Sequence, residues 1–69
     1  MSTLGERIKA LREALELSQQ AAADEAGITQ EHWCNIELGN RNPSIESLPG
    51  IARTLGVSQG DLLDSPRKT

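Results

Sequence analysis

Residues 19–38 read QQAAADEAGITQEHWCNIEL, and this stretch decides the fold. Gly27 divides it into two segments rich in helix-forming residues, and glycine is the usual residue where a helix ends with a positive φ. Small or apolar residues recur in both segments: Ala22, Ala23, Ala26, Ile28, Trp33 and Ile36. Two helices joined by a sharp turn bring such side chains together in the wedge between them. The stretch therefore predicts a helix-turn-helix motif.

Capping residues mark the ends of these two helices. Ser18 and Thr29 stand immediately before the segments, and both residue types are good N-caps, while Gly39 ends the second segment. Upstream, with Thr3 or Ser2 as N-cap, apolar residues follow the i, i+4, i+7, i+11 spacing of an amphipathic helix: Leu4, Ile8, Leu11 and Leu15. The first half of the chain is therefore predicted to hold three short helices.

A proline divides the helical pattern in the second half of the chain. Residues 40–44 are turn formers and predict a loop. The apolar residues beyond it have helical spacing: Ile45, Leu48, Ile51, Ala52 and Leu55. Pro49 lacks an N–H and would clash inside that helix, so we expect a turn over residues 44–48 and a helix with Pro49 at its first position. Gly56 ends this helix, and Ser58 caps a last short one.

Length and composition agree with a small helical domain. The chain has 69 residues, which is enough for one domain, and it is 36% hydrophobic and 25% charged, which is ordinary for a globular protein. Trp33 is its single aromatic residue. We predict an all-α fold: a compact five-helix bundle over residues 1–64, followed by a frayed tail at residues 65–69.

Several classes of function are excluded by residue content. His32 and Cys34 are the only residues of their types, and two positions apart on a helix they diverge too far to grip one metal ion or to act as base and nucleophile. We therefore expect no cofactor and no enzyme, and we interpret His32 as a packing or surface residue. No apolar run could span a bilayer, and no export signal is visible, which predicts a cytoplasmic protein associated with the nucleoid.

The second helix of the motif has two different faces. At about 100° per residue from Gln30, Trp33 and Ile36 fall near 300° and 240°, on the core side. The other side, from about 0° to 140° by the same count, holds Gln30, Glu31, Cys34 and Asn35. Gln and Asn side chains can pair with adenine, and Glu can accept from cytosine N4. This face suits reading of a DNA major groove, and the alternative is a polar face in contact with water alone.

A series of short segments carries a resemblance to a known family. In order they are residues 7–12 (RIKALR), 17–19 (LSQ), 26–30 (AGITQ), 36–37 (IE), Gly39, 41–44 (RNPS), 55–58 (LGVS) and 62–63 (LL). Together they resemble the Cro/repressor-type (XRE) helix-turn-helix DNA-binding domain over nearly the whole chain. The resemblance implies that the third helix enters the major groove and that its matching residues read bases: Gln30, Glu31, Cys34 and Asn35.

The same resemblance implies further roles. It makes Gln19, Thr29 and the loop residues Asn40, Arg41 and Asn42 candidate phosphate contacts. It also makes Arg12 and Glu37 a structural ion pair between the first and third helices. The chain departs from the family at Ala22, where Leu is common, and at Trp33, where Ile or Val is common. We interpret these as one compensated change, in which the indole fills the space of the missing leucine.

The predicted function is a sequence-specific transcriptional regulator, a repressor, of a bacterium or phage. Such proteins bind palindromic operators as dimers, and we expect a weak homodimer through the fourth and fifth helices. The candidate contacts are Leu55, Val57, Leu62 and Leu63, some of which must belong to the core instead. The net charge of −3 is unusual for a DNA-binding protein. It leaves one alternative open, a protein-interaction module on the same scaffold, such as an antitoxin or an anti-regulator, whose acidic surface binds a protein partner.

Overall fold

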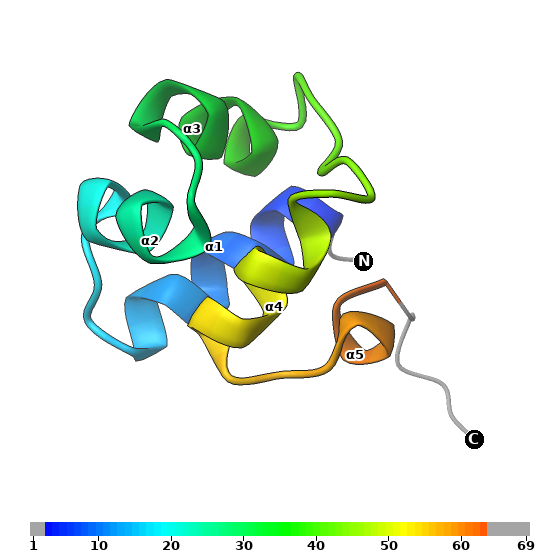
Figure 1. Cartoon of the computed structure of the whole chain (residues 1–69). Coiled ribbons are helices and arrows are strands. Elements are labelled where there is room, and N and C mark those ends of the chain that lie inside the picture. Colours follow the sequence, from blue (N-terminus) through cyan, green and yellow to red (C-terminus); the bar gives the residue numbers. More distant parts are fainter. Residues whose placement is uncertain (1–2, 64–69) are drawn as a thin grey trace.

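A computed structural model describes residues 3–63 of the chain (Figure 1). These residues form five helices, α1 (Leu4–Ala14), α2 (Gln19–Ala26), α3 (Gln30–Leu38), α4 (Leu48–Leu55) and α5 (Gln59–Leu63). The described part contains no strand, and the predicted all-α, five-helix architecture is confirmed. The predicted tail at residues 65–69 lies outside the described residues. Between residues 3 and 63, no helix is long and apolar enough to cross a membrane.

The ends of α2 and α3 lie where the capping residues predict them. Ser18 and Thr29 each accept a hydrogen bond from a backbone N–H in the first turn of the following helix, at 3.0 Å in both cases. Gly27 and Gly39 close the two helices in the left-handed conformation, with φ of 79° and 85°. These local interactions fix the turn between α2 and α3, so the helix-turn-helix motif follows from residues close in sequence.

The start of α4 corrects the prediction by one residue. The helix begins at Leu48, so Pro49 takes its second position rather than its first. The backbone N–H groups of Ser47 and Leu48 both donate to the carbonyl of Ser44, at 3.1 and 2.9 Å, and this turn carries the chain into the helix. Pro49 is tolerated there because the first N–H groups of a helix have no partner within the helix. Ile45 lies in the turn and is 89% exposed, as expected from the turn predicted over residues 44–48.

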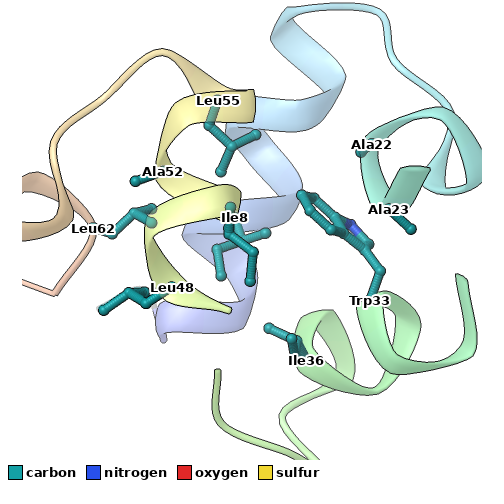
Figure 2. Packing of buried hydrophobic residues seen from close by; sticks show 10 residues of the cluster. Ile8, Ala22, Ala23, Trp33, Ile36, Leu48, Ala52, Leu55 and Leu62 are labelled. Carbon is teal, nitrogen blue, oxygen red and sulfur yellow. The ribbon is translucent and has the colours of Figure 1, made fainter. Parts of the chain in front are cut away.

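Trp33 occupies the middle of the core and is its largest fully buried side chain. Figure 2 shows the indole pointing into the cluster, with Ile8 on one side and Ala22 and Ala23 on the other. Both alanines are fully buried. A large side chain on α3 thus meets small ones on α2, which supports the interpretation of Trp33 and Ala22 as one compensated change.

Two glycines allow the backbones of neighbouring helices to touch. A Cβ atom added at Gly5 of α1 would lie 2.4 Å from the carbonyl oxygen of Ile36 in α3. At Gly50 of α4, a Cβ atom would lie 2.6 Å from the carbonyl oxygen of Ala26 in α2. Real Cβ atoms do not approach backbone so closely, so these glycines set the distances of α3 and α2 from the rest of the bundle.

Two of the four candidates for the dimer surface belong to the core. Leu55 is only 4% exposed and Leu62 only 1% exposed, because both pack into the core between α1, α4 and α5. Side chains that are buried in the core cannot contact a second chain. Val57 is half-buried and packs against the same core. The side chain of Leu63 lies outside the described part of the structure.

Candidate nucleic-acid interface

Helix α3 lies at the surface of the bundle and exposes one side to solvent (Figure 1). Gln30 and Glu31 are exposed, and Cys34 and Asn35 are half-buried, whereas the opposite side of the helix is buried. The structure therefore brings the four predicted base-reading residues together on one accessible face. Their side chains differ in hydrogen-bonding capacity, which is the property that distinguishes base edges in a major groove.

The buried side of α3 is held by a carboxylate that four donor atoms surround. Glu37, 8% exposed, accepts from Arg12 twice: Nε to Oε2 at 2.6 Å and Nη2 to Oε1 at 3.3 Å. The Gln19 Nε2 donates to Oε1 at 2.9 Å, and the Trp33 Nε1 donates to Oε2 at 2.6 Å. One side chain thus joins α1, α2 and α3, and the orientation of α3 is fixed from behind its exposed face.

The protonation of this cluster is set by two opposed effects. Burial alone would raise the pKa of Glu37, but the hydrogen bonds from Arg12, Gln19 and Trp33 outweigh it and hold that pKa below its ordinary value. The hydrogen bond to Glu37 in turn raises the pKa of Arg12. The pair therefore stays ionised at neutral pH. Its two charges compensate each other inside the protein, so Glu37 contributes little to repulsion of phosphate at the surface.

The side chain of Gln19 is only partly available for contact with a phosphate. Its amide nitrogen already donates one hydrogen to Glu37, and the residue is half-buried at the start of α2. A primary amide has two N–H donors, so the second remains for a ligand. Sequence reasoning missed the bond from Gln19 to Glu37, because only the packing of α2 against α3 brings residues 18 positions apart together.

The loop after α3 is attached to that helix through Asn35. The backbone N–H groups of Asn40 and Arg41 donate to its carbonyl oxygen at 3.0 and 3.2 Å. The Asn40 amide also donates to the Asn35 Oδ1, over 3.5 Å. Within residues 3–63 the Asn35 amide nitrogen has no partner, and an amide oxygen can accept a second bond. Asn35 therefore keeps the donor and acceptor that adenine recognition needs.

The remaining candidate phosphate contacts border the same face. Asn40, Arg41 and Asn42 follow α3 in the loop, and Thr29 is exposed at the start of α3. Thr29 and Arg41 line a surface hollow of about 270 Å³ together with Glu31, His32 and Asn35. His32 was not among the predicted site residues. Its spacing of three positions from both Thr29 and Asn35 is the signal that would have placed it on this side of the helix.

The interface is poor in positive charge. Within the described residues, Arg41 is the one cation that lines the hollow, and Glu31 offsets it there. Neutral donors such as amides, hydroxyls and backbone N–H groups make up the rest, and these can contact phosphate without net charge. Among residues 3–63, no group of three or more His, Cys, Asp or Glu side chains could hold a metal ion. The chemistry of the face is hydrogen bonding.

Comparisons with known proteins point in one direction. The chain is 36% identical over 55 residues to the immunity repressor protein of Bacillus phage phi105, which covers 80% of this chain and 38% of that protein. The structure of the present chain is similar to that of the P22 c2 repressor protein in complex with a synthetic operator. The TM-score is 0.87 at 28% sequence identity, and the match covers 91% of this chain and 96% of that one.

The chain is also similar to SinR of Bacillus subtilis, a master regulator for biofilm formation solved in complex with DNA. There the TM-score is 0.84 with 35% identity, over 90% of this chain and all of that one. The chain spans about half or less of the length of the first curated relatives it matches. Residues 5–67 match the family described as helix-turn-helix domain. The chain therefore belongs to the helix-turn-helix domain family and is of its Cro/repressor type.

Proposed function

We propose that this chain is a sequence-specific DNA-binding regulator of transcription, acting as a repressor, that reads the major groove with α3. The observation that carries the proposal is the combination of an accessible polar face on α3 with a buried network behind it. A reading helix must be rigid, because misplaced donors lose the geometry of bidentate contacts to bases. The similarity to two repressors, one of them solved with an operator, supports the same interpretation.

The proposal assigns each part of the face a task. Gln30 and Asn35 can each pair bidentately with an adenine, and Glu31 can accept from the N4 amino group of cytosine. Gln19, Thr29 and the loop residues Asn40, Arg41 and Asn42 would contact phosphates on either side and fix the register of the helix. Because few of these groups are charged, we expect affinity to depend less steeply on salt than it does for a basic DNA-binding protein.

We further propose that two copies of the chain bind a palindromic operator, with half-sites about one helical turn, roughly 34 Å, apart. Leu55 and Leu62 are unavailable for the contact between the copies because the core contains them. Of the predicted surface, Val57 retains partial exposure. Such a small apolar contact fits a dimer that forms on DNA, where the operator holds the two chains close together.

A selection from random duplexes at low salt tests this function. The purified chain is mixed with duplexes that contain a randomised segment, and bound DNA is recovered, amplified and sequenced over several rounds. The proposal predicts enrichment of a palindromic sequence. A chain with Gln30 and Asn35 both replaced by Ala serves as the control and should enrich no sequence. If the unaltered chain also enriches none, the proposal is wrong.

A protein-binding function is the second candidate, and two observations favour it. The net charge is −3. In addition, Leu15 is 49% exposed and borders a shallow hollow of about 390 Å³ with Leu17, Glu25 and Arg53, on other elements than α3. A chain that enriches no duplex but binds a basic protein partner through this surface would establish the second candidate in place of the first.

A further inference from the structure

The proposed DNA contacts do not include the imidazole of His32, which is a polar group. The residue is half-buried, and its backbone N–H is bonded to the Thr29 hydroxyl oxygen. Within the part of the chain that the structure describes, the ring makes no hydrogen bond or ion pair. The side chain lines the hollow of about 270 Å³ that also contains Thr29, Asn35 and Arg41, so a ligand seated there would meet it.

The hollow is lined by one carboxylate, Glu31, and one guanidinium, Arg41. Around α3, counted from Gln30 at about 100° per residue, Glu31 falls near 100°, Asn35 near 140° and His32 near 200°. Glu31 thus points toward the base-reading face. His32 lies farther round the helix and also borders a second hollow, with Ser44, Ser47 and the exposed carboxylate Glu46. His32 therefore borders both the hollow that Arg41 lines and the turn that follows the loop.

Three of the side chains that line this hollow, those of Thr29, His32 and Arg41, can donate hydrogen bonds. The Thr29 oxygen accepts from the backbone of His32, which leaves the hydroxyl hydrogen free to donate outward. A neutral imidazole has one N–H donor, and the Arg41 guanidinium has five. A phosphate group accepts from several donors at once. The convergence of three donor side chains in one concave surface beside the reading face matches the chemistry of a DNA backbone phosphate.

We infer that His32 is a further DNA contact, which donates its ring N–H to a backbone phosphate held between Thr29 and Arg41. The inference rests on the proposed DNA-binding function and adds a contact to it. Because backbone phosphates are the same in every sequence, this contact contributes affinity and position but no base preference. It would supply one of the donors that an acidic chain needs in addition to its few lysines and arginines.

The experiment pairs His32 variants with duplexes that carry single uncharged methylphosphonate linkages. The full chain and His32→Ala are titrated against the selected duplex and an unrelated one, and folding is checked by circular dichroism. We expect His32→Ala to weaken binding to both duplexes by a similar factor, roughly tenfold, and to leave the enriched sequence unchanged. His32→Gln, which keeps an N–H donor, should recover part of the affinity. Lys9→Ala, which removes an exposed cation outside the hollow, is the control.

The methylphosphonate series locates the phosphate. One linkage in each half-site should weaken binding of the unaltered chain by a clearly larger factor than binding of His32→Ala, because that variant has already lost one of the three donors to this phosphate. Equal weakening of both chains at every linkage would overturn the inference, as would a changed sequence preference in His32→Ala, which would indicate a base contact. If His32→Ala does not fold, His32→Leu, which also lacks a donor, takes its place in the same comparison. An unaltered chain that binds no duplex would overturn the proposed function and this contact with it.

Discussion

The two sides of α3 differ in burial and in chemistry. On the buried side, Trp33 and Ile36 fill the core, and Glu37 receives hydrogen bonds from α1, α2 and its own helix. On the exposed side, Gln30 and Glu31 meet solvent. The nine residues of α3 thus pack the core on one side of the helix and present polar groups on the opposite side. Stability should depend on one side and DNA recognition on the other, and substitutions on each side test whether this separation holds.

The largest effect is expected at the centre of the buried side. Trp33→Ala should lower the free energy of unfolding by about 3–5 kcal/mol, because it leaves a cavity and removes a donor from Glu37. For a domain this small, that is a large share of the total. Urea denaturation followed by circular dichroism measures it, with Trp33→Phe as the milder control. A change below about 1 kcal/mol would mean that the indole contributes little to the core.

Breaking the ion pair should have an effect somewhat smaller than removing the indole. Arg12→Met leaves the Glu37 carboxylate buried without its cation and should cost roughly 3–4 kcal/mol in stability. Replacing both residues by Met removes the unpaired charge, so the double variant should be more stable than Arg12→Met alone. Chemical denaturation of the unaltered chain, Arg12→Met, Glu37→Met and the double variant gives the coupling free energy between the two residues. Additive effects would show that the two side chains act independently.

Substitutions on the exposed side should give the opposite pattern. Gln30→Ala and Asn35→Ala should each weaken binding to the selected duplex by about 1–3 kcal/mol, the value of one bidentate pair with a base. The free energy of unfolding should change by less than about 0.5 kcal/mol, since neither side chain is in the core. Binding titrations and denaturation of the same samples separate the two quantities. A large decrease in stability with unchanged affinity would contradict the division of α3 into two sides.

A smaller effect is expected from pH, and it belongs to the buried side alone. The pKa of Glu37 is lowered in the folded chain, so its contribution to stability is complete above the ordinary value of 4.5 and is lost as pH falls through the folded value. Glu37→Gln should therefore lose less stability on acidification than the unaltered chain. Thermal unfolding at a series of pH values measures this. Parallel curves for the two chains would show that another carboxylate governs the acid response.

Local signals predicted most of the secondary structure. The bounds of α2 and α3 follow from Ser18, Gly27 and Thr29, whose effects act over a few residues. Pro49 was misplaced by one position because the N–H groups of both the first and the second residue of a helix lack a partner within it, so either position accepts proline. Ile45 has the helical spacing but lies in the turn, as Pro49 predicts, so the proline and not the periodicity shows where this helix begins.

What sequence could not supply was the tertiary arrangement. Leu55 and Leu62 were assigned to a dimer because apolar spacing does not distinguish a face that meets the core from one that meets a partner. The bonds from Gln19 and Trp33 to Glu37 depend on how α2 and α3 pack. The position of His32 beside Arg41 depends on the path of the loop after α3. These features emerge only when distant segments are placed together.

The most direct test of the central claim uses Cys34, the single cysteine of the chain and a half-buried residue of α3 on the proposed reading face. The rate of its alkylation by iodoacetamide is measured for the free chain, with saturating selected duplex, and with an unrelated duplex at the same concentration. If α3 lies in the major groove, the selected duplex should slow alkylation strongly and the unrelated duplex far less. An alkylation rate unchanged by a bound selected duplex would show that DNA meets another surface of the protein.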